Sequence, residues 1–345
     1  MRVTKRIFAI GFALCVVLGA PATSTAAPGY DQGRADLEWV MDYLVKWFPG
    51  VWDSAPQVWF ERNVRMPVDE GEHEHWHRTF ARIDAPQIGE VVFYGQINNG
   101  GRDGAIIGGS QVLYHAVIDE DLGAVNIFGQ GPLNPETYEN LHEHPELWDE
   151  VQFREREALN CDWIWRRDGN QIFGVLQGNT SEKQAYGPGT CSFISKRTDE
   201  EFRADAEWVL TPDQLWLYDN NWSAGMLFLG RDDQTHIRMH RAQPYTCEIE
   251  ASDDVDVVGH DRGHTMKMAT KAGRELQAIL LRAEYPAEDG TGRDDRLRLM
   301  ISDPSTGEAL ASTDADPLSR EIEIEFDGVE IECERSEHFA PLSGQ

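Results

Sequence analysis

The spacing of apolar residues predicts one helix near the N-terminus and a long series of strands after it. Helical i, i+3, i+4, i+7 spacing links Leu37, Val40, Met41, Leu44 and Phe48, and Pro49-Gly50 ends this segment. Short β-rich runs bounded by Gly, Asn and Asp then predict strands at 91–94, 111–118, 124–128, 161–165, 172–176, 191–195, 206–210, 215–218 and 236–240, with a helical excursion at 136–148. So many strands with so little helix predict a mainly β fold, a barrel or a sandwich, and about eight strands can close a barrel around a ligand.

Aromatic usage changes sharply along the chain, which predicts a second, smaller β unit. All 11 Trp lie between Trp39 and Trp222, whereas the C-terminal part contains very few aromatic residues. Apolar and acidic residues alternate at 321–326, and Asp327-Gly328 is a strong hairpin signal. We therefore expect a large β-barrel domain at 34–246, a small acidic β domain at 247–337 and a tail at 338–345.

The excess of acidic over basic side chains argues against two classes of binding partner. The 345 residues include 60 acidic and 31 basic side chains, for a net charge of −29, and 41% of the residues are hydrophobic. A hydrophobic fraction of that size is typical of a folded globular protein. Binding to nucleic acid requires clustered cations that neutralise phosphates, and docking on anionic lipid requires a basic patch. We therefore expect neither nucleic acid nor a membrane surface as a partner.

The N-terminal segment has the features of a secretory signal peptide. Residues 2–6 include three basic side chains, residues 7–20 are apolar, and small residues at 24–26 precede the expected cleavage site. A lipoprotein would need a small residue before Cys15, where this chain has leucine. No later stretch reaches the roughly 18 apolar residues of a membrane span. We expect a signal peptide at 1–26 and an exported mature chain, periplasmic or secreted, without a transmembrane segment.

Four cysteines remain after the expected cleavage, namely Cys161, Cys191, Cys247 and Cys333. An even number of cysteines in an exported protein predicts disulfides. Of the three possible pairings we favour Cys161 with Cys191 and Cys247 with Cys333, since each pair closes a local segment between predicted strands. Closely spaced Cys-x2-4-Cys pairs, which structural zinc sites use, are absent.

One histidine-rich segment raises the question of a metal site. His73, His75 and His77 would present three imidazoles on one face of a strand, alone or together with His142 and His144. The alternative is an exposed polar loop that continues the acidic residues just before this segment. The sequence favours the loop.

Other candidate sites give no stronger signal. His260 and His264 have helical spacing, but Gly263 disfavours a helix between them. The chain contains no Gly-x-Ser-x-Gly elbow and no Walker-type phosphate loop. We therefore predict no metal site and assign no catalytic residue.

Four polar residues and one tryptophan on predicted strands are candidates for lining a ligand pocket. Tyr94 and Gln96 alternate with apolar neighbours, as do Gln111 and Tyr114, so we expect each pair on one face of its strand. Facing into a barrel, these side chains would orient a ligand, whereas facing outward they would meet water. Trp163 is a further candidate for the pocket lining. Its alternative role is packing in the core. We predict ligand binding at these five residues.

Short elements between residues 36 and 250 occur in a recognisable order. They are the helix with Trp39, Ser-Ala-Pro-Gln at 54–57, Val-Phe-Tyr-Gly-Gln at 92–96, the strand at 111–114, Asn-Cys-Asp-Trp at 160–163, Phe-Gly at 173–174, Cys191, the segment 210–215 and Pro-Tyr at 244–245. In these elements and their order the larger unit resembles the CpcT/CpeT family of phycobiliprotein chromophore lyases. The arginines of the family's Tyr-Arg-Gln-Arg strand are absent, since Val112 and Leu113 follow Gln111.

This resemblance implies a lipocalin-like (calycin) antiparallel β-barrel with an N-terminal helix, whose mouth holds an open-chain tetrapyrrole. Family members attach a bilin to a cysteine of an acceptor protein, and orientation of the ligand would supply most of the catalysis. The resemblance thus implies an exported chromophore lyase-like protein that requires no cofactor and binds a bilin or a similar amphipathic molecule. The alternatives are a non-catalytic lipocalin-like carrier and an envelope interaction protein whose acidic C-terminal domain contacts a partner.

Overall fold

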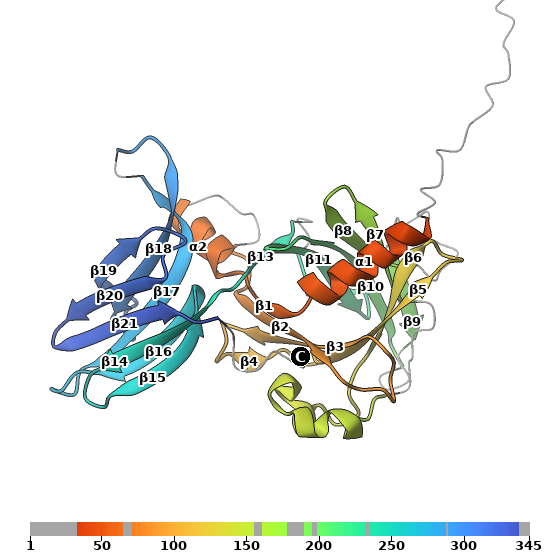
Figure 1. Ribbon diagram of the computed structural model, residues 1–345, viewed down its shortest axis with the longest axis horizontal. Helices are drawn as coiled ribbons and strands as arrows, with labels where there is room; N and C mark the ends of the chain where they lie inside the picture. The colour runs from red at the N-terminus through yellow and green to blue at the C-terminus, as the bar shows by residue number, and fades with distance from the viewer. Residues whose placement is uncertain are drawn as a thin grey trace, which may run out of the picture. The chain divides into compact units, whose positions relative to one another are not determined.

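The computed structural model describes residues 33–64, 71–154, 161–177, 190–194, 199–231, 235–287 and 289–337. The fold is mainly β, with 54% strand, as the sequence predicts (Figure 1). The expected signal peptide at 1–26 and the tail at 338–345 lie outside the described residues. In the part of the chain that the structure describes, no helix is long and apolar enough to cross a membrane.

Ten strands form a closed antiparallel β-barrel. In order around the barrel they are β1 (Gly50–Asp53), β2 (Trp76–Ile83), β3 (Val92–Asn99), β5 (Val112–Asp119), β6 (Ala124–Gln130), β7 (Trp163–Asp168), β8 (Gln171–Leu176), β10 (Glu201–Leu210), β11 (Gln214–Ser223) and β13 (Ile237–Arg241). The circle is complete because β13 pairs with β11 on one side and with β1 on the other. Three short strands, β4 (Ala105–Ile106), β9 (Thr190–Ile194) and β12 (Met226–Leu229), pair with β3, β10 and β11.

An aromatic core fills the barrel around Phe48, the residue that follows helix α1 (Arg34–Trp47). The ring of Phe48 stacks on Phe80 of β2 with 3.9 Å between centroids. It also lies within 6.2 Å of rings on β3, β5, β7 and β10, namely those of Phe93, Tyr114, Trp165 and Trp208. Because these strands stand around the whole barrel, Phe48 lies inside it. Val40 and Leu44 bury the apolar face of α1 in the same core.

The segment expected as a helical excursion covers the outside of β2, β3 and β5. It forms three 3₁₀ turns, η1 (Pro135–Tyr138), η2 (Leu141–Glu143) and η3 (Pro145–Glu150), drawn in yellow-green in Figure 1. Tyr138 and Leu141 pack against strand residues that include Ala81, Ile83, Val92, Tyr94 and Leu113. Side chains alternate between the two faces of a strand, so the neighbours of Phe80 and Phe93 point outward. These strands are therefore buried on both faces, which explains their continuous apolar runs.

Two four-stranded antiparallel sheets form the C-terminal part of the chain. One contains β14 (Pro244–Glu250), β15 (Val255–His260), β20 (Glu321–Phe326) and β21 (Val329–Arg335), and the other contains β16 (Arg262–Ala269), β17 (Glu275–Pro286), β18 (Arg293–Ser302) and β19 (Ala309–Ala315). Ile249 and Ile331 of the first sheet share an apolar core with Leu280 and Leu299 of the second, so the two sheets form a sandwich. The hairpin predicted at Asp327-Gly328 joins β20 to β21. The domain limits at 246 and 337 stay a prediction.

Helix α2 (Ala55–Val64) is absent from the elements that the sequence predicts. Asp53 fixes its start, because the Oδ1 of Asp53 accepts a hydrogen bond from the N–H of Ala55 at 2.8 Å, as in a helix cap. Further along α2, the ring of Trp59 lies 5.4 Å from that of Tyr285 on β17. The end of β1 is thereby held close to the C-terminal sheets.

Two pairs of cysteines lie at disulfide distance, and they are the pairs that the sequence favours. The Cα atoms of Cys161 and Cys191 are 5.5 Å apart, and those of Cys247 and Cys333 are 4.0 Å apart. Cys247 and Cys333 face each other across β14 and β21. Paired cysteines are typical of proteins that fold in an oxidising compartment.

Candidate functional site

A buried arginine lies among the aromatic rings of the barrel interior. Arg78 of β2 is 3% exposed, and its guanidinium lies 4.5 Å from the ring centroid of Phe80 and 4.3 Å from that of Trp208. Its Nη2 donates a hydrogen bond to the hydroxyl of Tyr114 at 3.1 Å. Burial raises the pKa of Tyr114 and of Asp219, which faces the same interior, and the charge of Arg78 opposes both shifts. The interior thus combines an aromatic wall with a fixed cation.

Several donors in this interior have no acceptor within the described part of the chain. They are Nε and Nη1 of Arg78 and the Nε1 atoms of Trp165 and Trp208, all of them buried. A buried donor without a partner costs about 1–3 kcal/mol, so native proteins pair almost all of them. Because these four atoms are all donors, the group that would satisfy them is an acceptor, and a carboxylate also matches the charge of Arg78.

Two of the five predicted ligand-binding residues face this interior. Tyr114 contacts Arg78, and the ring of Trp163 lies 4.4 Å from that of Trp208. Gln111 lies on the other face of the chain from Tyr114, because an odd number of positions separates them and side chains alternate. The expectation that Gln111 and Tyr114 share a face is therefore wrong.

Tyr94, Gln96 and Gln111 point away from the barrel interior and form a hydrogen-bonded network under the 3₁₀ turns. The hydroxyl of Tyr94 lies 2.7 Å from the Oε1 of Gln96 and 2.9 Å from the carbonyl oxygen of Tyr138. The Nε2 of Gln96 donates to the Oδ1 of Asn140 at 2.8 Å, and the Nε2 of Gln111 donates to the backbone of η1 at 2.9 Å. These side chains are buried, and their hydrogen bonds hold the 3₁₀ turns η1 and η2 against the strands.

A carboxylate at the end of β1 contacts two histidines. Asp53 is 0% exposed, its Oδ1 lies 2.8 Å from the Nε2 of His75, and its Oδ2 lies 3.0 Å from the Nδ1 of His77. Burial acts to raise the pKa of Asp53, but the charge of His75 and the hydrogen bonds of both histidines outweigh it and hold the pKa well below its usual value. Burial acts to lower the pKa of His75, but the attraction of Asp53 leaves it raised. Asp53 is therefore a buried anion.

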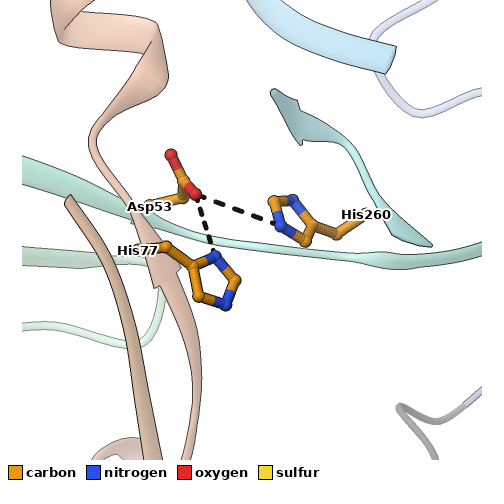
Figure 2. A group of neighbouring side chains, drawn as sticks. All are labelled: Asp53, His77 and His260. Carbon is orange, nitrogen blue, oxygen red and sulfur yellow. Dashed lines mark hydrogen bonds and ion pairs between the residues drawn. The ribbon is translucent and has the colours of Figure 1, made fainter. Parts of the chain in front are cut away.

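His260, at the end of β15, joins this cluster from the C-terminal part of the chain (Figure 2). Its Nε2 lies 4.0 Å from the Oδ2 of Asp53, and its ring stacks on that of His77 with 5.1 Å between centroids. Burial, with His77 nearby, holds the pKa of His260 well below its usual value. A cavity of about 250 Å³ adjoins the cluster. We call it the histidine pocket, and its lining includes His77, His260, His142, Gln96, Asn98, Asn140 and Arg102.

The histidines that the sequence grouped together are only partly brought together by the structure. His142 lines the histidine pocket, where burial lowers its pKa to about 4. The Nδ1 of His73 instead lies 2.7 Å from the Oε1 of Glu61, and His144 contacts Glu146 near the surface. Of the five histidines, only His77 and His142 line the pocket, and His75 supports it through Asp53.

Sequence reasoning missed Asp53 and did not connect His260 with His77. The sequence contains one indication of the role of Asp53. Asp-Ser-Ala-Pro after a short apolar run is typical of a capped helix start. The segment 73–77 also spells His-Glu-x-x-His, which binds zinc when it is helical. Here β2 begins at Trp76, so this segment is not helical and its two outer histidines have different partners.

A larger cavity, of about 570 Å³, is lined by residues of α2, β11 and β13 and of the C-terminal strands. We call it the arginine pocket, because its lining includes Arg238, Arg241, Arg262, Arg282 and Arg335. Most of these guanidinium groups hold the chain together. Arg282 donates hydrogen bonds from Nε and Nη2 to the Oδ2 of Asp295, at 3.1 and 2.7 Å, and Arg241 donates to the carbonyl oxygens of Pro212 and Pro49. The carboxylates of Asp213, Asp261, Glu284 and Asp295 share this lining and offset part of the positive charge.

The fold and these cavities define a β-barrel protein that can bind a ligand. No protein-family model and no curated protein sequence matches the chain. Among solved structures, a CRL protein of Arabidopsis aligns over 60% of this chain and 99% of its own length, with 10% sequence identity and a TM-score of 0.41. A similarity at this level does not bear on function, and membership of the CpcT/CpeT family is not shown.

Proposed function

We propose that the barrel interior binds a bilin or another amphipathic carboxylate, with Arg78 as the anchoring cation. The observation that carries this proposal is the set of buried donors on Arg78, Trp165 and Trp208 that have no acceptor in the described part of the chain. A carboxylate accepts two parallel hydrogen bonds from a guanidinium, and such charge-assisted bonds are about twice as strong as neutral ones. The surrounding rings offer contact area for the apolar body of the ligand.

Arg78 would supply a cation in place of the family arginines that this chain lacks. The family that the sequence resembles carries cations on the strand that corresponds to 111–114, whereas this chain has Val112 and Leu113 there. Arg78 stands on β2, two strands away from β5 through β3, and reaches Tyr114 on β5. In a lipocalin-like (calycin) barrel, Arg78 would place a cation beside β5, the strand on which the family carries its arginines. The cation would come from β2 and not from β5 itself.

The number of strands sets how wide the barrel interior is. Barrel diameter grows with strand number, and an interior of about eight strands is just filled by side chains or holds one small ligand. The ten strands of this barrel enclose a wider interior, which the aromatic core around Phe48 occupies, so a ligand would lie among these rings.

A carrier is the simpler form of this function, and we propose it ahead of a lyase. A carrier needs only the anchor and the aromatic wall. A lyase that attaches a bilin to cysteine needs in addition a thiol from an acceptor protein, because the four described cysteines lie in pairs, and a group that manages the proton. Asp219 and Tyr114 are the interior groups that could take this role. With either form we propose export to the periplasm or the medium.

The test is a titration of the purified protein with biliverdin, followed by quenching of tryptophan fluorescence. We expect saturable quenching at micromolar biliverdin, because the ring of Trp208 adjoins the anchor. Replacement Arg78→Met should weaken binding at least about tenfold, the equivalent of roughly one charge-assisted hydrogen bond, and Arg78→Lys should weaken it less. Circular dichroism of each variant shows whether the barrel has formed.

Arg238→Met is the matched control, because Arg238 is an exposed barrel-strand arginine that lines the arginine pocket. It should bind biliverdin as the unmodified protein does. Absence of saturable quenching in the unmodified protein would overturn the proposal. So would weakened binding in Arg238→Met with full binding in Arg78→Met, which would move the ligand to the arginine pocket.

A further inference from the structure

Three potential metal ligands converge at the end of β1. The Oδ2 of Asp53 lies 3.0 Å from the Nδ1 of His77 and 4.0 Å from the Nε2 of His260, and one candidate ligand atom from each of the three residues lies within 4.8 Å of the other two. The point equidistant from three atoms with those separations is at most about 2.4 Å from each, whereas zinc bonds to imidazole nitrogen and carboxylate oxygen measure about 2.0–2.2 Å. Shifts of a few tenths of an ångström would close the difference. We propose that Asp53, His77 and His260 bind a divalent metal ion.

The chemistry of the three ligands favours zinc or a similar transition metal ion. Two imidazole nitrogens and one carboxylate oxygen suit Zn²⁺ and its neighbours, whereas Mg²⁺ and Ca²⁺ prefer oxygen ligands throughout. The three residues are 0%, 4% and 1% exposed, so the ligands are shielded from bulk solvent except where His77 and His260 face the histidine pocket. They belong to β1, β2 and β15, and the ion would therefore join the barrel to a C-terminal strand.

The carboxylate of Asp53 is already oriented toward the two histidines. Its Oδ1 accepts hydrogen bonds from the N–H of Ala55 and the Nε2 of His75, each at 2.8 Å, which leaves Oδ2 directed at His77 and His260 (Figure 2). Metal ligands are commonly held by such a second set of hydrogen bonds, and their loss typically costs 10–100-fold in metal affinity. His75 is therefore a positioning residue for the ion.

Three protein ligands leave at least one coordination position open, as in catalytic rather than structural zinc sites. His77 and His260 both line the histidine pocket, so the open position would face a cavity of about 250 Å³. The amides of Gln96 and Asn98 and the guanidinium of Arg102 share this lining. A water molecule or a small polar ligand could reach the ion there.

This site is distinct from the one proposed for the bilin. Arg78 and His77 are neighbours on β2, and their side chains therefore point to opposite faces of the strand. Arg78 faces the aromatic interior of the barrel, and His77 faces the histidine pocket outside it. The metal proposal does not depend on the bilin proposal.

The experiment is a titration of the protein, stripped with a chelator and dialysed, with Co²⁺ followed by visible absorption, and then with Zn²⁺ as competitor. We expect one Co²⁺ per chain, displaced by one Zn²⁺. His260→Gln and Asp53→Asn should each weaken Co²⁺ binding by at least about 100-fold, since they remove a ligand. His75→Gln should weaken it about 10–100-fold. His144→Gln, which changes a half-exposed histidine paired with Glu146, should leave binding unchanged.

The alternative is an Asp–His hydrogen-bond cluster that only holds the chain together. In that case the unmodified protein would bind no Co²⁺ at micromolar concentration, or His260→Gln would bind it as tightly, and either result would overturn the proposal. Circular dichroism separates loss of metal from loss of fold, and His77→Gln provides a second ligand variant if His260→Gln does not fold. Biliverdin quenching measured with and without chelator should be the same, so each proposal can fail without the other.

Discussion

The guanidinium of Arg78 donates a hydrogen bond to the hydroxyl of Tyr114 across the interior of the barrel, over 3.1 Å. The two residues stand on β2 and β5, with β3 between them. This contact explains why Tyr114 belongs to the interior site, whereas Gln111, only three positions earlier, binds the backbone of η1. It also places a cation inside a chain whose net charge is −29.

Replacement of Phe48 by alanine should destabilise the barrel strongly. Its ring contacts aromatic side chains on five strands, and removing a buried phenylalanine costs about 3–5 kcal/mol in the free energy of unfolding. Urea unfolding followed by tryptophan fluorescence measures the difference. Phe228→Ala, at a side chain that is 59% exposed, should change the free energy by less than about 0.5 kcal/mol. Equal effects of the two changes would contradict the central position of Phe48.

The two cysteine pairs should contribute unequally to stability. They close loops of 30 and 86 residues, for which loop entropy predicts about 3.6 and about 4.6 kcal/mol. The double change Cys247→Ala with Cys333→Ala should therefore lower the unfolding free energy more than Cys161→Ala with Cys191→Ala. Thermal unfolding of both double variants makes the comparison. Alkylation of the unreduced, denatured protein at these cysteines, seen by mass spectrometry, would show that the pairs are not bonded.

Replacement of Tyr94 by phenylalanine should weaken the packing of the 3₁₀ turns η1 and η2 against the outside of β3. The buried hydroxyl interacts with Gln96 and with the backbone of Tyr138, and its loss should cost about 1–2 kcal/mol. Hydrogen exchange should then speed up in η1 and η2 while the interior strands keep their protection. Tyr43→Phe, on helix α1, is the control. Loss of biliverdin quenching in Tyr94→Phe, with the fold intact, would mean that Tyr94 serves the ligand site after all.

The Asp314 carboxylate should contribute stability that acid removes. Hydrogen bonds from Arg298, at 2.6 and 2.8 Å, lower the pKa of Asp314 against the opposing effect of partial burial. A lowered folded-state pKa means that the stabilisation is complete above the unfolded pKa, about 3.9, and disappears as the pH falls through the folded value. Asp314→Asn should therefore lower the unfolding free energy at pH 7 by roughly 0.5–1 kcal/mol, since this pair is partly exposed.

The measurement is urea unfolding of Asp314→Asn and the unmodified protein at pH 7 and below pH 3. The difference should be present at the higher pH and close to zero at the lower one. Glu325→Gln, at an exposed position of β20, is the control for loss of one negative charge. A difference that grows on acidification would contradict the predicted direction.

The sequence by itself determined the features that depend on neighbouring residues. Apolar spacing at Leu37, Val40 and Leu44 indicated α1, short β-rich runs indicated the mainly β class, and Asp327-Gly328 indicated the hairpin. Such signals are local because helix spacing, strand alternation and turn conformation are set within a few residues. The sequence left three cysteine pairings open and favoured one of them, and the structure places these two pairs at disulfide distance.

Only the tertiary structure decided which side chains share a site. Alternation does not show which face of β2 or β3 is inside when the 3₁₀ turns bury the outer face as well. Only the structure places Tyr94 and Gln96 outside the barrel interior, where Gln96 lines the histidine pocket. Asp53 and His260 are far apart in the chain, and their proximity depends on barrel closure and on α2 packing against β17. Sites of this kind arise from long-range packing, which no short stretch of sequence encodes.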